Sequence, residues 1–187
     1  MKYQIIISTS PGWAGKPIVA NLVTKLDEFN LSREIWNPGI LKNMPELAFS
    51  INQTHSLPDI ISSGVLWLIS NRLSNILKGF GVAFESFPVS LIGSSEIVST
   101  YQLFHLLQIT HIVDIQKSEI QGIDNVKSIT LAEMDETPEL AMVRDSLLQS
   151  LVFVREDLIS TFTQEHITGC DWMNPTDFSF SLRRKRW

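Results

Sequence analysis

Hydrophobic and polar residues alternate most readably in the middle of the chain. The apolar run from Val65 to Ile69 is short and continuous, as in a strand that is covered on both faces. Ser70 is a favourable N-cap residue, and Gly79 supplies a left-handed stop for a helix between them. An apolar stripe at i, i+3 and i+4 fits that helix, and it consists of Leu73, Ile76 and Leu77. Residues 82–88 predict a second strand, which completes a strand–helix–strand unit.

The same pattern recurs 85 residues later. Residues 151–154 repeat the apolar run, and the acidic pair that follows favours the first turn of a helix. The apolar stripe recurs as Leu158 and Phe162, and residues 167–172 lead to Pro175, which corresponds to Pro88 if the second copy has two extra residues in its loop. Apolar positions recur, whereas the cap and the exposed residues do not. We therefore interpret the unit as a duplicated scaffold.

The remaining segments are rich in predicted strands. Residues 3–7 predict an opening strand, and Pro17 followed by apolar residues at helical spacing predicts a helix to about Phe29. Proline and glycine interrupt residues 36–57, which predicts a long surface connection. Residues 101–115 predict one long or two short strands, and residues 126–131 another. This pattern predicts an α+β fold with a mixed, mostly antiparallel sheet and short helices.

The length of 187 residues allows one well-buried core. We expect a single domain over residues 1–187, made of an N-terminal region (1–56) and the duplicated region (57–187). Apolar runs fall far short of the roughly 20 residues that span a bilayer, so no membrane association is predicted. The single cysteine, Cys170, agrees with a reducing compartment, and we expect a cytoplasmic protein.

The net charge of −5 is unevenly distributed. Residues 1–113 hold seven acidic and seven basic residues, residues 114–177 hold thirteen acidic and four basic ones, and the last ten carry a charge of +4. An acidic balance argues against nucleic acid as the partner, because binding to phosphates requires a basic face. It suits a basic protein partner, whose approach a negative surface accelerates, although a merely solvated acidic surface is the simpler alternative.

Candidate chemistry is sparse. Residues 12–17 superficially resemble a phosphate-binding loop, but only two residues separate the glycines and proline follows the lysine, so no nucleotide or other cofactor is predicted. His55, His105, His111 and His166 are most simply packed or surface residues. His166 and Cys170 have a spacing that suits metal only on a helix, and the residues between them favour an extended segment. No metal or catalytic site is predicted; an enzyme that uses His105, His111 or His166 is the alternative.

Several segments, taken in order, resemble one bacterial family. They are Leu57–Ile61, Leu68–Leu73, Val82–Glu85, Tyr101–Phe104, Val113–Ser118 and Leu151–Val154. Together they resemble the immunity proteins of polymorphic toxin systems, the group first catalogued as a domain of unknown function and later numbered eleven and forty-three among immunity families. The resemblance covers the chain from Leu57 onward and departs from the group at Arg155, which stands where the first unit has its cap serine.

The resemblance implies a small cytoplasmic protein that binds a cognate toxin and blocks it in the producing cell. We interpret Ser70 and the segment 114–118 as structural, because aspartate and serine at a strand end commonly fix a turn. The predicted partner is a toxin with a basic contact surface, and a homodimer is left open. The predicted partner-binding residues are Glu133, Asp135, Glu136 and Glu139, with Trp172 as an apolar anchor that could equally belong to the core.

Overall fold

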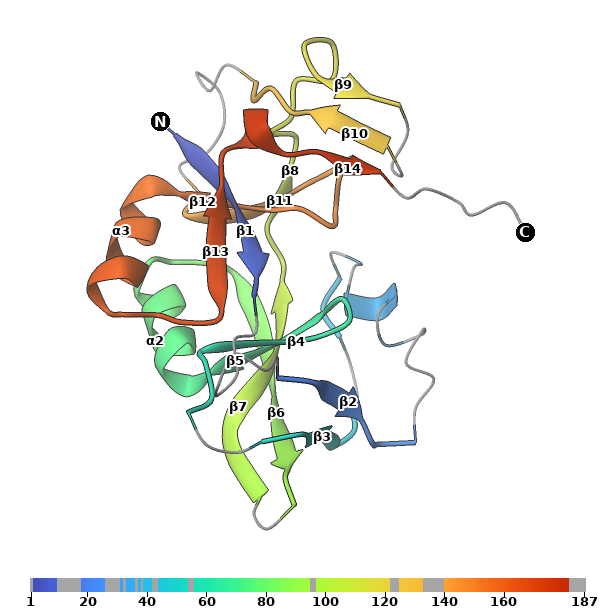
Figure 1. Cartoon of the computed structure of the whole chain (residues 1–187), viewed down its shortest axis with the longest axis vertical. Coiled ribbons are helices and arrows are strands. Elements are labelled where there is room, and N and C mark those ends of the chain that lie inside the picture. Colours follow the sequence, from blue (N-terminus) through green and yellow to red (C-terminus); the bar gives the residue numbers. More distant parts are fainter. Residues whose placement is uncertain are drawn as a thin grey trace.

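The strands of this computed structural model form three sheets with two helices on one side (Figure 1). The structure describes residues 2–9, 18–25, 31, 33–35, 37, 39–41, 44–53, 56–94, 97–121, 125–132 and 140–181. All strand pairings in these residues are antiparallel except those of β3 with β6 and of β8 with β11. The predicted α+β fold with a mixed, mostly antiparallel arrangement is confirmed.

The lower sheet in Figure 1 has six strands in the order β2-β3-β6-β7-β5-β4. Its strands are β2 (Ala20–Leu22), β3 (Leu47–Ile51), β4 (Ile60–Ser63), β5 (Leu66–Ser70), β6 (Phe84–Ile92) and β7 (Ile97–Leu106). Helix α2 (Asn71–Gly79) follows β5 directly.

The upper sheet has five strands in the order β13-β1-β12-β11-β8. They are β1 (Tyr3–Ser8), β8 (Ile109–Thr110), β11 (Met142–Asp145), β12 (Val152–Arg155) and β13 (Cys170–Met173). Helix α3 (Glu156–Gln164) follows β12, and the short 3-10 helix η2 (Pro175–Asp177) follows β13. A three-stranded sheet at the top of the molecule contains β9 (Glu119–Ile120), β10 (Asn125–Ser128) and β14 (Phe180–Ser181).

The two main sheets contain matching arrangements. In the lower sheet, the hairpin β4-β5 leads through α2 to β6, and β7 lies between β5 and β6. In the upper sheet, the hairpin β11-β12 leads through α3 to β13, and β1 lies between β12 and β13. The inserted strand follows β6 directly in the first case and comes from the start of the chain in the second. This correspondence supports the duplication, which stays a prediction.

The helix starts match in their backbone bonds and differ in their side chains. The Ser70 N–H donates to Asp59 O at 2.9 Å, and the Arg155 N–H donates to Ala141 O at the same distance. The Ser70 hydroxyl accepts from the Leu73 N–H, as predicted for an N-cap, whereas Arg155 makes no side-chain cap bond. The scaffold is therefore common to both units, and the cap is not.

The helix ends match as well. Gly81 and its counterpart His166 both have left-handed backbone, with φ of 68° and 51°. Gly79 is the last helical residue, so the prediction that it supplies the left-handed stop is wrong by two positions. The residue after each left-handed position donates its N–H back to the helix, from Val82 to Leu77 O at 3.1 Å and from Ile167 to Phe162 O at 2.8 Å.

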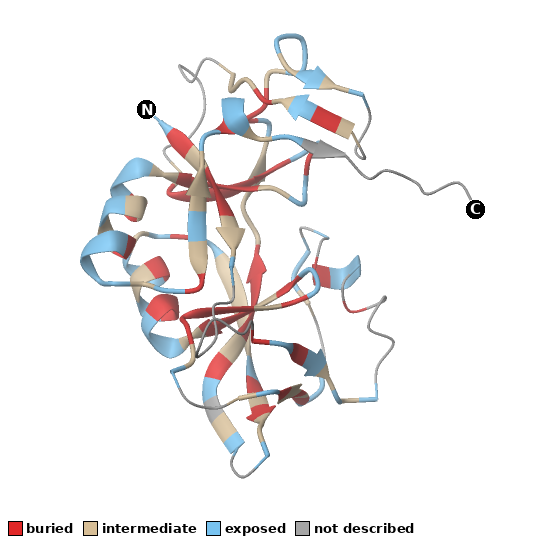
Figure 2. Ribbon diagram, in the orientation of Figure 1, coloured by how far each residue is buried: buried red, intermediate tan, exposed pale blue. Residues whose placement is uncertain are grey.

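The two units share one buried core between the helices and the sheets. It includes four of the five stripe residues of the helices, all nearly inaccessible: Leu73, Leu77, Leu158 and Phe162. The fifth, Ile76, is partly buried against the same core. Two further clusters cover the outer faces of the lower and upper sheets. In β5, Leu68 faces the outer cluster and Ile69 the shared core, so this strand is covered on both faces as predicted. Exposed positions lie on the outer surfaces of α2 and α3 (Figure 2). Among the described residues, no helix has the length and apolar character that crossing a membrane requires.

Two predictions for the first fifty residues are wrong. The described part of the predicted helix, residues 18–25, contains β2 instead, with Val19 and Val23 about half exposed on either side of the buried Ala20. Residues 17 and 26–29 lie outside the described residues. Apolar residues at these positions fit a helix or a strand equally, and pairing with β3 decides between them. The connection predicted over residues 36–57 contains β3, in which Leu47 and Phe49 are fully buried. The alternation of large apolar and small residues over Leu47–Ile51 was the signal for a strand.

Asp59 joins the two units at the start of α2. Its carboxylate accepts from the Ser70 hydroxyl at 2.7 Å, from Arg72 Nη2 at 2.7 Å and from the Thr168 N–H at 3.0 Å. Arg72 also donates to the carbonyl of Glu165 at the end of α3. Burial alone would raise the pKa of Asp59, but the bonds from Arg72, Ser70 and Thr168 hold it below its ordinary value.

We expect this site to make stability depend on pH. The pKa of Asp59 is lower in the folded than in the unfolded protein. Its contribution to the free energy of unfolding is therefore fully present above the unfolded-state pKa of about 4, and it is lost as the pH falls below that value. Asp59→Asn should reduce the free energy of unfolding by about 1–3 kcal/mol at neutral pH. Arg72 is 52% exposed, so its ion pair supplies little of this. Urea unfolding of the unaltered protein and of Asp59→Asn, from pH 7 to pH 3, measures the difference in the free energy of unfolding. If both proteins lost the same stability on acidification, the prediction would be contradicted.

Candidate functional site

A largely apolar pocket lies where the two matched hairpins meet. Its volume is about 240 Å³. The β4-β5 turn contributes Gly64 and Val65, and the loop between β11 and β12 contributes Gln149 and Ser150. The pocket walls are side chains of four strands (β5, β7, β11 and β12) and of the segment before β3, namely Ile35, Trp67, Phe104, Leu106, Arg144 and Val152. Both units therefore build this pocket, which we call the Arg144 pocket.

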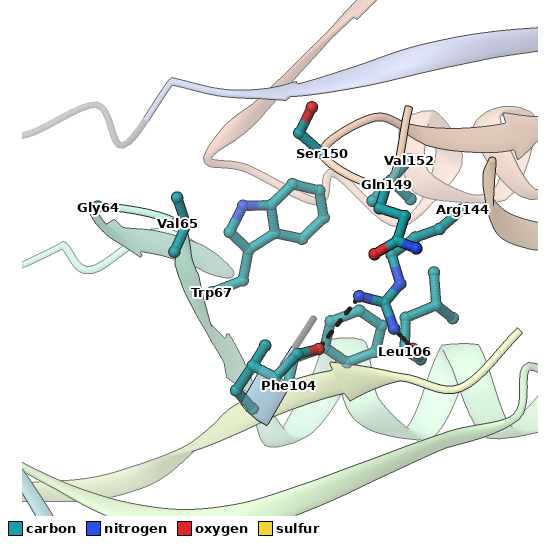
Figure 3. A pocket seen from close by; sticks show the side chains of 10 residues that line it. Gly64, Val65, Trp67, Phe104, Leu106, Arg144, Gln149, Ser150 and Val152 are labelled. Atoms are coloured by element: carbon teal, nitrogen blue, oxygen red, sulfur yellow. Dashed lines mark hydrogen bonds between the residues drawn. The ribbon is translucent and has the colours of Figure 1, made fainter. Parts of the chain in front are cut away.

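Arg144 is the charged residue of the pocket. It is 5% exposed, and its terminal nitrogens donate to the carbonyl oxygens of Ile35 at 3.1 Å and of Leu106. Burial lowers the pKa of Arg144 to about 10, which still leaves the guanidinium positively charged at neutral pH. The pocket thus combines an apolar wall with a buried positive charge. Figure 3 shows Arg144, Trp67 and Gln149 extending toward this space from three different segments.

Aromatic rings form the wall that belongs to the lower sheet. Trp67 on β5 and Phe104 on β7 are paired across the strands, with ring centroids 6.3 Å apart and planes 14° from parallel. Phe84 packs against Phe104 from behind at 5.2 Å. In the upper sheet the position matching Trp67 is Val152, which is smaller. This difference between the units helps to leave room for the pocket.

Polar bonds hold the segment that carries Ile35. His105 is fully buried, with Nδ1 3.0 Å from Glu85 Oε2 and Nε2 2.8 Å from the carbonyl oxygen of Asn37. The same Glu85 oxygen accepts from the Leu41 N–H at 2.9 Å. The imidazole thus lies between the Glu85 carboxyl group and the backbone carbonyl of Asn37. His105 therefore positions one wall of the pocket.

The other described histidines, His111 and His166, and the cysteine are not assembled into a site. His166 is exposed and lies beyond the end of α3, and Cys170 begins β13, so the two do not form a helical ligand pair. His111 is exposed as well, and His55 lies outside the described residues. Burial raises the pKa of the Cys170 thiol to about 12, which keeps it protonated. In the parts of the chain that are described, no three His, Cys, Asp or Glu residues lie in a group that could hold a metal ion.

The predicted partner-binding residues are only partly placed. Glu133, Asp135, Glu136 and Glu139 lie outside the described residues. Trp172 lies on β13, with its ring 5.6 Å from that of Phe162 and its side chain packed against the shared core. Trp172 is thus partly buried against the core, as the core alternative expected. A contact with a partner stays a prediction.

The segment 114–118 forms the structural turn that the sequence predicted. Asp114 Oδ1 accepts from the N–H groups of Gln116 at 3.0 Å and Lys117 at 3.1 Å. The Ser118 hydroxyl donates to Asp114 O at 2.6 Å and accepts from the Thr130 N–H at 2.8 Å. These bonds close the turn and attach it to the strand region near β10.

Sequence analysis missed the most unusual polar pair of the structure, Arg144 and Asp145. The Asp145 carboxylate is fully buried and accepts four backbone N–H groups, from Ile112, Val113, Leu147 and Leu148, at 2.7–3.0 Å. The available signal was the position of two charged residues directly after the apolar run 140–143. Such charges are buried only when hydrogen bonds satisfy them, so they mark a special environment.

Comparison of the sequence with protein-family models matches no family, and comparison with curated proteins finds no match. The resemblance to immunity proteins therefore rests on the segments quoted above and enters only as a proposal.

Proposed function

We propose that this chain is an immunity protein that binds and occludes a cognate protein toxin through an acidic surface. The observation that carries the proposal is the opposite charge of the two matched helices. Residues 71–80, comprising α2 and its C-cap, contain two basic residues and no acidic one. Residues 156–165, comprising α3 and its C-cap, contain three acidic residues and no basic one. The scaffold is matched, but the surface charge is reversed.

Only part of the negative charge of residues 114–177 is exposed and available to a partner. Asp145 is buried and bound by amides, and Asp157 is paired with Arg155 at 2.7 Å. Glu156 on α3 and Glu165 at its C-cap are exposed. Exposed acids of this kind accelerate the approach of a basic partner, while buried anchors supply most of the affinity.

Two further observations support a toxin as the partner. The segments from Leu57 onward resemble immunity proteins, and the N-cap and turn residues within them make the structural bonds that this interpretation expected.

Co-expression tests the proposal directly. Cells that express the toxin encoded beside this gene should survive when this chain is present, and the two proteins should purify as a stoichiometric complex. A toxin that remains lethal, with no complex recovered at micromolar concentrations, would overturn the proposal.

Charge neutralisation tests the binding surface. The double variant Glu156→Gln/Glu165→Gln should slow association with the toxin about threefold or more at low ionic strength, and the difference should shrink at high salt. Neutralising Glu133, Asp135, Glu136 and Glu139 together should act in the same direction. Stopped-flow kinetics measures both.

The matched control is Glu34→Gln/Glu46→Gln, which removes two exposed acids from the other half of the molecule. The control changes the net charge by the same amount. It should therefore slow association only by the small, non-specific effect of that change in net charge. Equal slowing by the control and by the α3 variant would place the contact elsewhere.

A further inference from the structure

The Arg144 pocket has the size of a small-molecule site. Its volume of about 240 Å³ lies just below the range of about 300–1,000 Å³ that is usual for ligand pockets. This space admits a small organic molecule, and it is too small for a folded segment of another protein. Its floor is formed by strands of two sheets, so the site is largely preformed.

The apolar walls select the body of the occupant. Trp67, Phe104 and Val152 present aromatic and aliphatic surface to the pocket, and Leu106 adds to it. Burial of apolar ligand surface against such walls stabilises a complex by about 25 cal/mol per Å². A chain of methylene groups or an aromatic ring fits these walls, whereas a sugar or a nucleotide would leave its polar groups without partners.

The buried guanidinium selects the charge of the occupant. Arg144 brings a positive charge to an apolar wall, and its terminal nitrogens donate hydrogen bonds to the carbonyl oxygens of Ile35 and Leu106. An anionic group in the pocket would therefore meet a positive charge where the dielectric constant is low. The planar guanidinium matches the geometry of a carboxylate, and a single negative charge matches the single positive one. Gln149 and Ser150 at the exposed edge add neutral donors.

We infer that the Arg144 pocket binds a small apolar monocarboxylate, with the carboxylate toward Arg144 and the hydrocarbon body against Trp67 and Phe104. The inference does not depend on the proposed toxin binding, because the pocket lies at the junction of the two units and α3 is not part of its lining. Either proposal can fail while the other holds.

Calorimetric titration of the whole chain with three eight-carbon ligands tests the inference. Octanoate should bind, octanamide should bind about ten- to a hundredfold more weakly because it lacks the charge, and octylammonium should not bind. A longer ligand, a peptide that ends in phenylalanine with a free carboxylate, should bind more weakly than octanoate. Equal affinities of octanoate and octanamide, absence of octanoate binding at millimolar concentration, or tighter binding of the peptide would each overturn it.

Substitutions at the exposed edge locate the site without disturbing the core. Ser150→Trp should fill the pocket entrance and weaken octanoate binding about tenfold or more. The matched control is Ser146→Trp, at an exposed position of the same loop outside the pocket lining, which should leave binding unchanged. Arg144→Lys should retain binding with reduced affinity if the variant folds. Equal octanoate affinities of Ser150→Trp and the unaltered protein would show that the ligand binds elsewhere and would overturn the inference.

Discussion

Replacing Asp145 with alanine is expected to lower the free energy of unfolding by about 3–5 kcal/mol. The Asp145 side chain is fully buried, and each of its oxygens accepts two backbone N–H groups. Without the carboxylate, these donors are left without an acceptor where water has little access, and each unsatisfied group costs about 1–3 kcal/mol. Urea unfolding followed by circular dichroism measures the change.

Asp145→Asn refines this test. Asparagine keeps one acceptor oxygen and replaces the other by an NH2 group, which faces N–H donors and repels them. The loss should therefore be large but smaller than for alanine. Asp177→Asn, at an exposed position, should change stability by no more than about 0.5 kcal/mol. An Asp145→Ala protein as stable as this control would show that water or a relaxed backbone replaces the carboxylate.

Gly169→Ala is expected to destabilise the protein by about 2–5 kcal/mol, the sum of overpacking and backbone strain. Gly169 has φ of +91°, and a Cβ at this position would lie 2.2 Å from the carbonyl oxygen of Ile60. The contact atoms belong to the backbone of β4, so no side chain can turn away to relieve the clash. The hydrogen bond from the Thr9 N–H to Gly169 O at 3.0 Å further fixes this position. Thermal and urea unfolding measure the loss.

Gly64→Ala separates the clash from the strain. Gly64 also has left-handed backbone, with φ of +59°, but no atom lies within 4 Å of a Cβ built there. It should lose only the cost of backbone strain, about 1–2 kcal/mol. If Gly169→Ala and Gly64→Ala lowered the free energy of unfolding equally, the close contact between Gly169 and the backbone of β4 would be contradicted.

Both sites connect parts of the chain that are far apart in sequence. Asp145 joins the end of β11 to the segment after β8, and Gly169 joins the start of β13 to β4. The Arg144 pocket lies beside the first of these connections. Loss of stability at Asp145 is therefore expected to affect the pocket, which is why the ligand test uses exposed residues at the pocket edge.

The sequence by itself determined the elements whose signals are local. The strand–helix starts at Ser70 and Arg155, the apolar stripe of each helix and the turn at 114–118 depend on residues within a few positions of one another. Hydrogen bonding and burial within one helical turn or one β-turn largely decide such elements. For this reason the prediction of the two helices and of the α+β class was confirmed.

Only the tertiary structure decided the elements that depend on distant partners. Residues 20–22 form a strand because β3 supplies hydrogen bonds, and a three-residue segment cannot specify such a pairing by itself. Arg144 and Asp145 are buried because carbonyl and N–H groups from remote segments satisfy them. The sequence shows which charges follow an apolar run, but the burial of a charge depends on the groups that the fold brings to it.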